Sequence, residues 1–170
     1  VPPDDVPAMA KVARQTSIPI ATGERLTTKY EFARVLESRA ASILQLNLSR
    51  AGGILEGKKI ASMAEAFGAQ IAPHLYNGPI GAAANIQFAT CSPNFLILES
   101  TRDFSDFHAE LLRTPITWEN GRVVPSTEPG IGVELNEEIA RANPYEGNET
   151  HLVMADDPID VADPLTSTGE

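Results

Sequence analysis

The sequence has a single cysteine, few aromatic residues, far fewer basic than acidic side chains, and no long hydrophobic run. With Cys91 alone, an internal disulfide framework and a cysteine-based zinc site are excluded, and a reducing, cytoplasmic setting is expected. Thirteen Lys and Arg stand against 23 Asp and Glu, which gives a net charge of −10. This balance argues against non-specific binding of nucleic acid or anionic membrane, because both need clustered basic side chains. No apolar run approaches the roughly 20 residues of a membrane-spanning helix.

The 170 residues, 42% of them hydrophobic and 21% charged, have the composition of a soluble globular protein. This length is enough for one domain with a real core. The chain begins at Val1 rather than Met, and no basic and apolar segments of a signal peptide follow. We therefore expect a piece of a longer protein whose natural start lies upstream.

Four short apolar runs recur at a regular spacing. They begin at residues 18, 43, 70 and 95, so the spacings are 25, 27 and 25 residues, and each interval holds a helix-like segment. Strand-helix units of this length predict an α/β fold with a parallel sheet and right-handed crossovers. The predicted strands cover residues 18–22, 43–46, 70–72 and 95–98.

Plausible helix ends surround these strands. A helix is predicted from a cap at Asp4 or Asp5 to about residue 14, and another from a cap at Thr28 through residue 36. A third runs from residue 54 to 67, with Gly68 in the position that ends a helix. A fourth, from about residue 79 to 89, is nearly free of charge and should be buried on more than one side.

The pattern changes after residue 100. Polar loops and turns fill residues 101–143, with a further short helix expected over 137–142. Residues 144–170 hold no Lys or Arg and are rich in acid, so this tail is expected to be solvated or disordered, or to dock on a part of the protein outside this chain. The predicted domain, a partial barrel of strands and helices, therefore covers residues 1–143.

Polar side chains follow the four runs at the point where each one ends. Glu24, Asn47, His74 and Glu99 come at or just after these apolar stretches. In parallel α/β folds the carboxyl ends of the strands meet at one edge, where functional residues gather. A single strand-end Glu or His is more often structural, but four at one edge favour a site. Such a set suits either binding of a hard metal such as Mg²⁺ or proton abstraction by the histidine.

Three stretches of sequence resemble the enolase superfamily. They are similar to its mandelate racemase and muconate lactonizing enzyme branch, and within that branch to galactonate-dehydratase-like sugar-acid dehydratases. The resemblance covers roughly residues 1–145. The stretches read IATGER at 20–25, QLNLSRAGGI at 45–54, and APH at 72–74 with GPI at 78–80.

The resemblance implies a modified TIM barrel with an N-terminal capping domain, of which this chain supplies the second half. It implies that Mg²⁺, held by three carboxylates, stabilises the enediolate formed when the α-proton of the substrate is removed. Glu24 matches the third metal ligand, and His74 matches the catalytic base or acid. Glu99 matches the residue that forms a hydrogen bond with the substrate carboxylate. Arg25 and the loop of Tyr76 are expected to lie near the substrate.

One position departs from the family pattern. Asn47, which lies 23 residues after Glu24 and 27 before His74, stands where the family usually has an Asp paired with the histidine. Its amide oxygen can still accept a hydrogen bond from the ring but brings no charge, so His74 is expected to be a weaker base or to serve as an acid. The corresponding change in a serine-protease triad lowers kcat by about 10⁴. The alternative is that Asn47 only caps the turn before residues 49–53.

The family's acid/base Lys, its first two metal carboxylates and its capping domain would all lie upstream of Val1. A single carboxylate does not hold Mg²⁺ well, and half a barrel leaves two sheet edges unpaired. The isolated chain is therefore expected to be inactive and to need the missing half, in cis or as another chain. Intact relatives are generally oligomeric, so a homo-oligomer is expected of the intact protein.

Four interpretations follow. The leading one is a Mg²⁺-dependent dehydratase of aldonic or aldaric acids. A racemase or cycloisomerase of the same superfamily shares the metal and the enediolate. A truncated, non-catalytic fragment or interaction module is the third. An unrelated doubly wound binding domain is disfavoured, because no G-x-G-x-x-G or P-loop pattern occurs.

Overall fold

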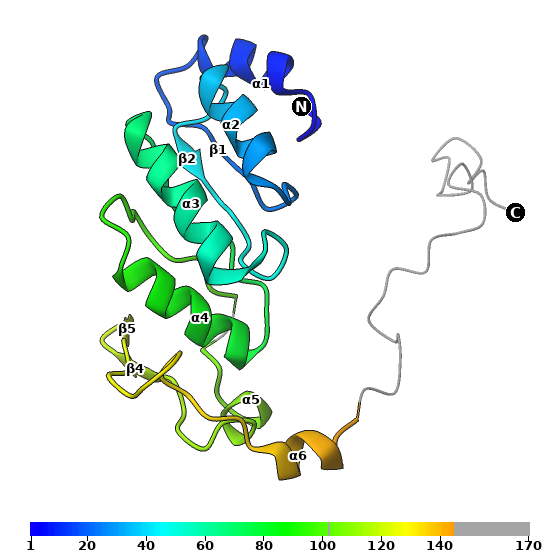
Figure 1. Ribbon diagram of the computed structural model, residues 1–170, viewed down its shortest axis with the longest axis vertical. Helices are drawn as coiled ribbons and strands as arrows, with labels where there is room; N and C mark the ends of the chain where they lie inside the picture. The colour runs from blue at the N-terminus through cyan, green and yellow to red at the C-terminus, as the bar shows by residue number, and fades with distance from the viewer. Residues whose placement is uncertain (102, 145–170) are drawn as a thin grey trace, which may run out of the picture.

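The computed structural model describes residues 1–101 and 103–144, which extend from α1 at one end of the long axis of the molecule to α6 at the other (Figure 1). Three short strands, β1 (Ala21–Thr22), β2 (Ile43–Leu44) and β3 (Gln70–Ile71), form a parallel sheet in that order. Helix α2 (Lys29–Glu37) connects β1 to β2, and α3 (Gly53–Ala66) connects β2 to β3. The α/β fold class is confirmed, in an arrangement consistent with the C-terminal half of a barrel.

The fourth predicted strand is reduced to a single parallel bridge. Phe95 is the bridge partner of Ile71, and the backbone N–H of Leu96 donates to the carbonyl of Ile71 at 2.9 Å. Beyond this point the segment has no further partner strand within the described residues, and Ile97 is 63% exposed. Within the described chain, this segment is hydrogen-bonded to a neighbouring strand on one side alone. The lack of a second partner explains why the apolar run does not extend into a regular strand.

The predicted helix ends are present. Asp5 caps α1 (Val6–Ala13) by accepting the backbone N–H of Ala8 at 3.0 Å. Thr28 caps α2 in a capping box with Glu31. Helix α3 ends before Gly68, whose φ of +72° favours glycine.

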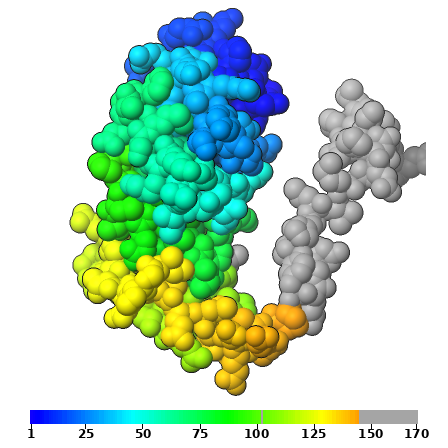
Figure 2. Space-filling view, in the orientation of Figure 1, coloured from blue at the N-terminus to red at the C-terminus, as the bar shows by residue number. Residues whose placement is uncertain are grey.

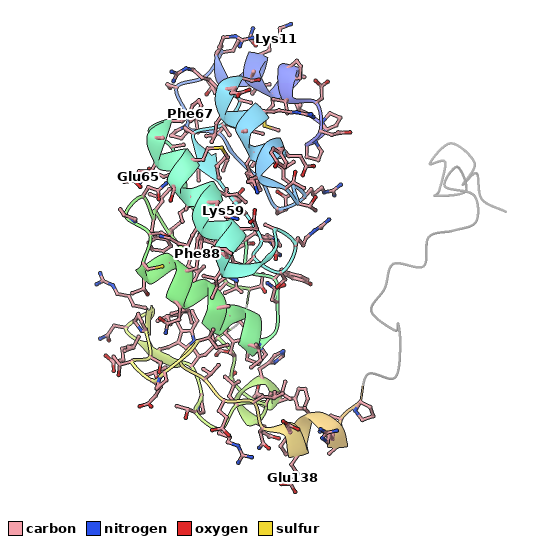
Figure 3. All side chains as sticks on the ribbon, viewed as in Figure 1. Lys11, Lys59, Glu65, Phe67, Phe88 and Glu138 are labelled. Carbon is pink, nitrogen blue, oxygen red and sulfur yellow. The ribbon has the colours of Figure 1, made fainter. Side chains whose placement is uncertain are left out.

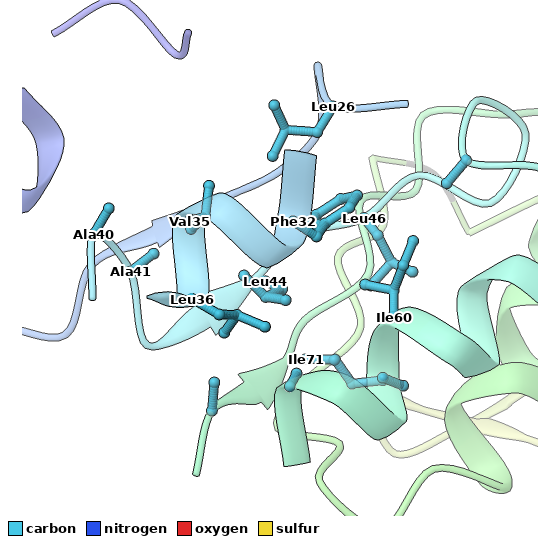
Figure 4. Close-up of a cluster of buried hydrophobic side chains, with 14 of the residues drawn as sticks. Leu26, Phe32, Val35, Leu36, Ala40, Ala41, Leu44, Leu46, Ile60 and Ile71 are labelled. Atoms are coloured by element: carbon cyan, nitrogen blue, oxygen red, sulfur yellow. The ribbon is translucent and has the colours of Figure 1, made fainter. Parts of the chain in front are cut away.

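The core lies between the helices and one face of the sheet (Figure 4). Phe32 of α2, Leu44 of β2, Ile60 of α3 and Ile71 of β3 are fully buried there. Gly57 allows α3 to approach this layer, since a Cβ at that position would lie 2.5 Å from Cδ2 of Leu48. Larger side chains at position 57 would push the helix away from the sheet.

Helix α4 (Pro79–Thr90) is buried on more than one side, as its lack of charge predicts. Ala82, Asn85 and Phe88 are all fully buried. Ala83 and Ala89 are buried as well, so the buried positions cover more of the helix circumference than the single apolar stripe of a surface helix. In Figure 3 Phe88 is labelled between α3 and α4, whereas Lys59 and Glu65 of α3 are exposed.

The segment after residue 100 contains elements where the sequence pattern predicts loops. They are α5 (Phe107–Glu110) and an antiparallel hairpin of β4 (Thr117–Glu119) and β5 (Arg122–Val124). The short helix expected over 137–142 is present as α6 (Glu137–Ala142). The predicted acidic tail lies outside the described residues from position 145 onward.

The described chain forms an elongated body rather than a closed one (Figure 2). Lys11 near the N-terminus and Glu138 of α6 lie at opposite ends (Figure 3). Within residues 1–101 and 103–144, no helix combines the length and apolar character that crossing a membrane requires.

Candidate active site at the carboxyl ends of the strands

Backbone hydrogen bonds continue the parallel ladder beyond the assigned strands. The N–H of Gln45 donates to Thr22 at 2.8 Å, and the N–H of His74 donates to the carbonyl of Leu46 at 3.1 Å. The chain therefore stays in register as far as the residues that follow β1, β2 and β3. This places Glu24, Asn47 and His74 at the same edge of the sheet.

Asn47 and His74 are in direct contact. Nδ2 of Asn47 lies 2.9 Å from Nδ1 of His74, and Asn47 is only 4% exposed. The structure thus brings together the two residues whose pairing the sequence comparison implied. Their catalytic roles remain predictions.

The direction of this contact corrects one expectation. The amide oxygen of Asn47 was expected to accept a hydrogen bond from the histidine ring. Instead Oδ1 of Asn47 accepts the backbone N–H of Ser49 at 2.9 Å, and the amide nitrogen faces the ring. Asn47 therefore caps the turn at residue 49 and also contacts His74.

Glu99 lies on the other side of the histidine. Its Oε2 is 4.0 Å from Nε2 of His74, which is too long for a hydrogen bond. The same oxygen is buried and has no hydrogen-bond partner within the described residues. A buried carboxylate oxygen without a partner is costly, so this atom is suited to a ligand that brings a donor.

Glu24 occupies a different part of the edge. Its Oε1 lies 3.8 Å from Nε of Arg25, and both side chains are substantially exposed. They line a hollow of about 420 Å³ beside β1. No hydrogen bond or ion pair within the described chain joins Glu24 to Asn47, His74 or Glu99.

Tyr76 follows His74 along the chain and remains close to it. Their ring centroids are 6.4 Å apart, and Tyr76 is 70% exposed. In the same loop, Nδ2 of Asn77 lies 3.5 Å from Oδ1 of Asn47. Tyr76 is therefore free to contact a substrate, whereas Asn77 supports Asn47 from the side away from the ring.

The donor set for a metal is incomplete in this chain. Within residues 1–101 and 103–144 no group of three or more His, Cys, Asp and Glu side chains could hold a metal ion. Mg²⁺ requires a near-octahedral set of oxygen ligands. The residues described here do not fit a Mg²⁺ site by themselves, and Glu24 can contribute only one ligand.

Two supporting residues were not identified as such from the sequence. Gly23 has φ of +141°, and a Cβ there would lie 2.8 Å from Cε1 of Phe32 and 3.0 Å from the backbone nitrogen of Gln45. Ser49 orients Asn47 through its backbone N–H. A glycine directly before a strand-end acid was the available signal for the first, whereas a backbone donor leaves no signal in the sequence.

Comparison with known proteins agrees with this arrangement. The family model for enolase C-terminal domain-like proteins matches residues 1–139. The chain belongs to this family. Within the enolase C-terminal domain-like family, a D-galactonate dehydratase from Cronobacter sakazakii is 43% identical to the chain and is matched over 75% of the chain and 35% of its own length.

Solved structures give the same family. A candidate mandelate racemase/muconate lactonizing enzyme from Labrenzia alexandrii is 68% identical, with a TM-score of 0.85, over 89% of this chain and 39% of that one. An enolase from Agrobacterium radiobacter, named as a candidate galactarate dehydratase and solved with Na and L-malate, is 27% identical, with a TM-score of 0.76, over 85% and 40% of the two chains. The enolase C-terminal domain-like chain thus spans well under half the length of these relatives.

Proposed function

We propose that this chain is the C-terminal portion of a Mg²⁺-dependent sugar-acid dehydratase that acts on aldonic or aldaric acids. The observation that carries the proposal is the cluster of Asn47, His74 and Glu99 at the carboxyl ends of the strands, with His74 within 4.0 Å of both neighbours. The kinship with a D-galactonate dehydratase supports a sugar acid as the substrate class.

In this proposal each residue has a distinct role. A base outside the described chain removes the α-proton of the sugar acid. His74 faces the β-hydroxyl and assists its departure as water, which leaves a 2-keto-3-deoxy acid after tautomerisation. Glu99 forms a hydrogen bond with the substrate carboxylate, with one proton shared between the two groups, and this satisfies its unpartnered oxygen.

Glu24 is the residue that would contribute to the metal site. In the completed protein it would be one of several carboxylates that hold Mg²⁺, and the ion would supply a positive charge that stabilises negative charge on the substrate. Arg25, which is 71% exposed beside Glu24, is placed to contact a polar substituent of the sugar acid. The other metal ligands and the base come from a segment in cis or from another chain.

The test is a screen of aldonic and aldaric acids with Mg²⁺, on the protein produced from the reading frame extended upstream of Val1. We expect formation of a 2-keto-3-deoxy acid, and a loss of at least about 10²-fold in kcat for His74→Gln, because the imidazole N–H no longer faces the negative charge that develops on the leaving hydroxyl. Glu24→Gln should weaken binding of Mg²⁺. The matched controls are His108→Gln and Glu65→Gln, which lie away from these residues.

The products distinguish the alternatives. Inversion of a stereocentre without loss of water would replace the dehydratase with a racemase, and rearrangement with ring closure would replace it with a cycloisomerase. If no sugar acid reacts and His74→Gln changes nothing, the catalytic proposal fails and the chain is a non-catalytic member of the family.

A further inference from the structure

The two ends of the Asn47 side chain can be told apart by their neighbours. The backbone N–H of Ser49 lies 2.9 Å from Oδ1, and the amide nitrogen of Asn77 lies 3.5 Å from the same atom. The backbone N–H of Ser49 can only donate, so the atom beside it must be the accepting oxygen. The atom that faces His74 at 2.9 Å is therefore the amide nitrogen, which can only donate.

This assignment fixes the histidine ring. A neutral imidazole has one nitrogen that donates and one that accepts, and the hydrogen bond at one nitrogen decides the state of the other. Nδ1 of His74 receives the N–H of Asn47, so it must be the accepting nitrogen. The ring proton then resides on Nε2, the nitrogen that faces Glu99.

An aspartate at position 47 would produce the opposite arrangement. A carboxylate only accepts, so it would require a proton on Nδ1 and leave Nε2 with a free lone pair. Nε2 would then be able to take a proton from a substrate. In a Ser-His-Asp triad, the same replacement of Asp by Asn leaves the histidine in the wrong tautomer for base catalysis.

We propose that Asn47 is a positioning residue that holds neutral His74 with its proton on Nε2, so that the ring presents a hydrogen-bond donor, and not a base, to the substrate. The tautomer follows from the contacts alone; its use on a sugar acid rests on the proposed function. Neutral His74 then donates a hydrogen bond from Nε2 to the departing hydroxyl, and the proton that completes the water is the α-proton, returned by the group that removed it. The α-proton must be removed by a different group, which disfavours a racemase that uses His74 as one of its bases.

The test is ¹⁵N NMR of the full chain labelled at its histidine rings, at about pH 8, above the ordinary range of histidine titration. Two-bond couplings between ring nitrogens and ring carbon protons show which nitrogen carries the proton. We expect the Nε2–H form of His74 to exceed the Nδ1–H form by at least about tenfold. The Nδ1–H form loses the hydrogen bond from Asn47 and places two N–H donors against each other. A His74→Gln variant assigns the signals.

Asn47→Asp is the informative variant, because it has the same shape and reverses the hydrogen-bonding character. We expect Nδ1 of His74 to gain a proton in this variant. His108, on α5 and away from Asn47, is the internal control, and its signals should not change. The wild-type spectrum tests the proposal even if the variant does not fold.

The outcomes separate the two proposals. A proton on Nδ1 of His74 in the wild type, or a spectrum that does not respond to Asn47→Asp in a folded variant, overturns the positioning role without affecting the dehydratase proposal. The tautomer experiment can also give the expected result while the sugar-acid screen on the extended protein fails. In that case the positioning role of Asn47 is supported, and only the proposed substrate is overturned.

Discussion

At the scale of single residues, Gly23 determines where Glu24 can lie. Its φ of +141° is strained for any other residue, and a Cβ would lie 2.8 Å from the buried ring of Phe32. We expect Gly23→Ala to lower the free energy of unfolding by about 2–3 kcal/mol, since it combines backbone strain with overpacking. Urea unfolding measures this change.

Gly68→Ala is the matched control for that substitution. Gly68 also has a positive φ, of +72°, but a Cβ there would meet nothing within 4 Å. Gly68→Ala should lower the free energy of unfolding by roughly 1–2 kcal/mol, which is the cost of placing a residue with a Cβ in left-handed backbone. If Gly23→Ala and Gly68→Ala lowered the free energy of unfolding equally, the contact of a Cβ at position 23 with Phe32 would not contribute to the loss of stability.

The residue scale also shows how far the sequence can be interpreted. Glu24, Asn47 and His74 could be placed at one edge because each follows an apolar run of a repeating unit. The direction of the Asn47 amide could not, because it depends on the backbone N–H of Ser49. Amide orientation is a property of three-dimensional neighbours, and the sequence alone favoured the opposite hydrogen bond.

At the scale of elements, the capping box of α2 makes a pH-dependent contribution to stability. Oε2 of Glu31 accepts the side-chain hydroxyl and the backbone N–H of Thr28, each at 2.8 Å. These hydrogen bonds, with that of the Thr28 side chain the largest cause, hold the pKa of Glu31 below its ordinary value of 4.5. A lowered pKa in the folded state means that the stabilisation is present above pH 4.5 and is lost as the pH falls through the folded value.

We therefore expect Thr28→Ala to cost about 1 kcal/mol in free energy of unfolding near neutral pH. The cost should shrink in acid, below the ordinary pKa of Glu31, because protonated Glu31 no longer accepts strong charge-assisted hydrogen bonds. Urea titrations at several pH values measure both parts. Ser62→Ala, at an exposed position inside α3, should have little effect, and a cost of Thr28→Ala that is constant with pH would contradict the role of Glu31.

Elements were predicted well where an amphipathic or apolar pattern was long enough to recognise. Helices α1 to α4 were found from their caps and apolar spacing. The hairpin of β4 and β5 was missed, although Asn120 and Gly121 form its turn with φ of +51° and +75°. An Asn-Gly pair between strand-forming residues is a strong hairpin signal. Its strands are short and mostly exposed, so their apolar pattern was too weak to recognise.

At the scale of the whole molecule, β1 is an open edge of the sheet among the residues that the structure describes. Backbone oxygens of Ile20 and Thr22 accept N–H groups from the β2 side, those of Ile43 at 3.2 Å and Gln45 at 2.8 Å. Because backbone groups alternate in direction along a strand, the N–H and C=O of Ala21 point to the open side. An open edge of this kind favours pairing with a further strand.

We expect the chain alone to self-associate, and Ala21→Pro to reduce this association at least severalfold, because proline removes the outward N–H while edge positions tolerate it. Sedimentation velocity measures the effect. Ala21→Val keeps the N–H and should associate like the wild type. Equal association of the proline and valine variants would show that the β1 edge is not where chains meet.

The order of the elements has a consequence for how this chain comes to be folded. Helices α1 to α4 each pack on the helix before or after them, and each strand pairs with its neighbour in the sequence. The paired strands are 22 and 27 residues apart in the sequence, so no pairing has to wait for a distant part of the chain. During synthesis, α1, β1 and α2 can therefore dock on β2 before α4 has left the ribosome. The strand and helix on which each later unit packs are then already folded.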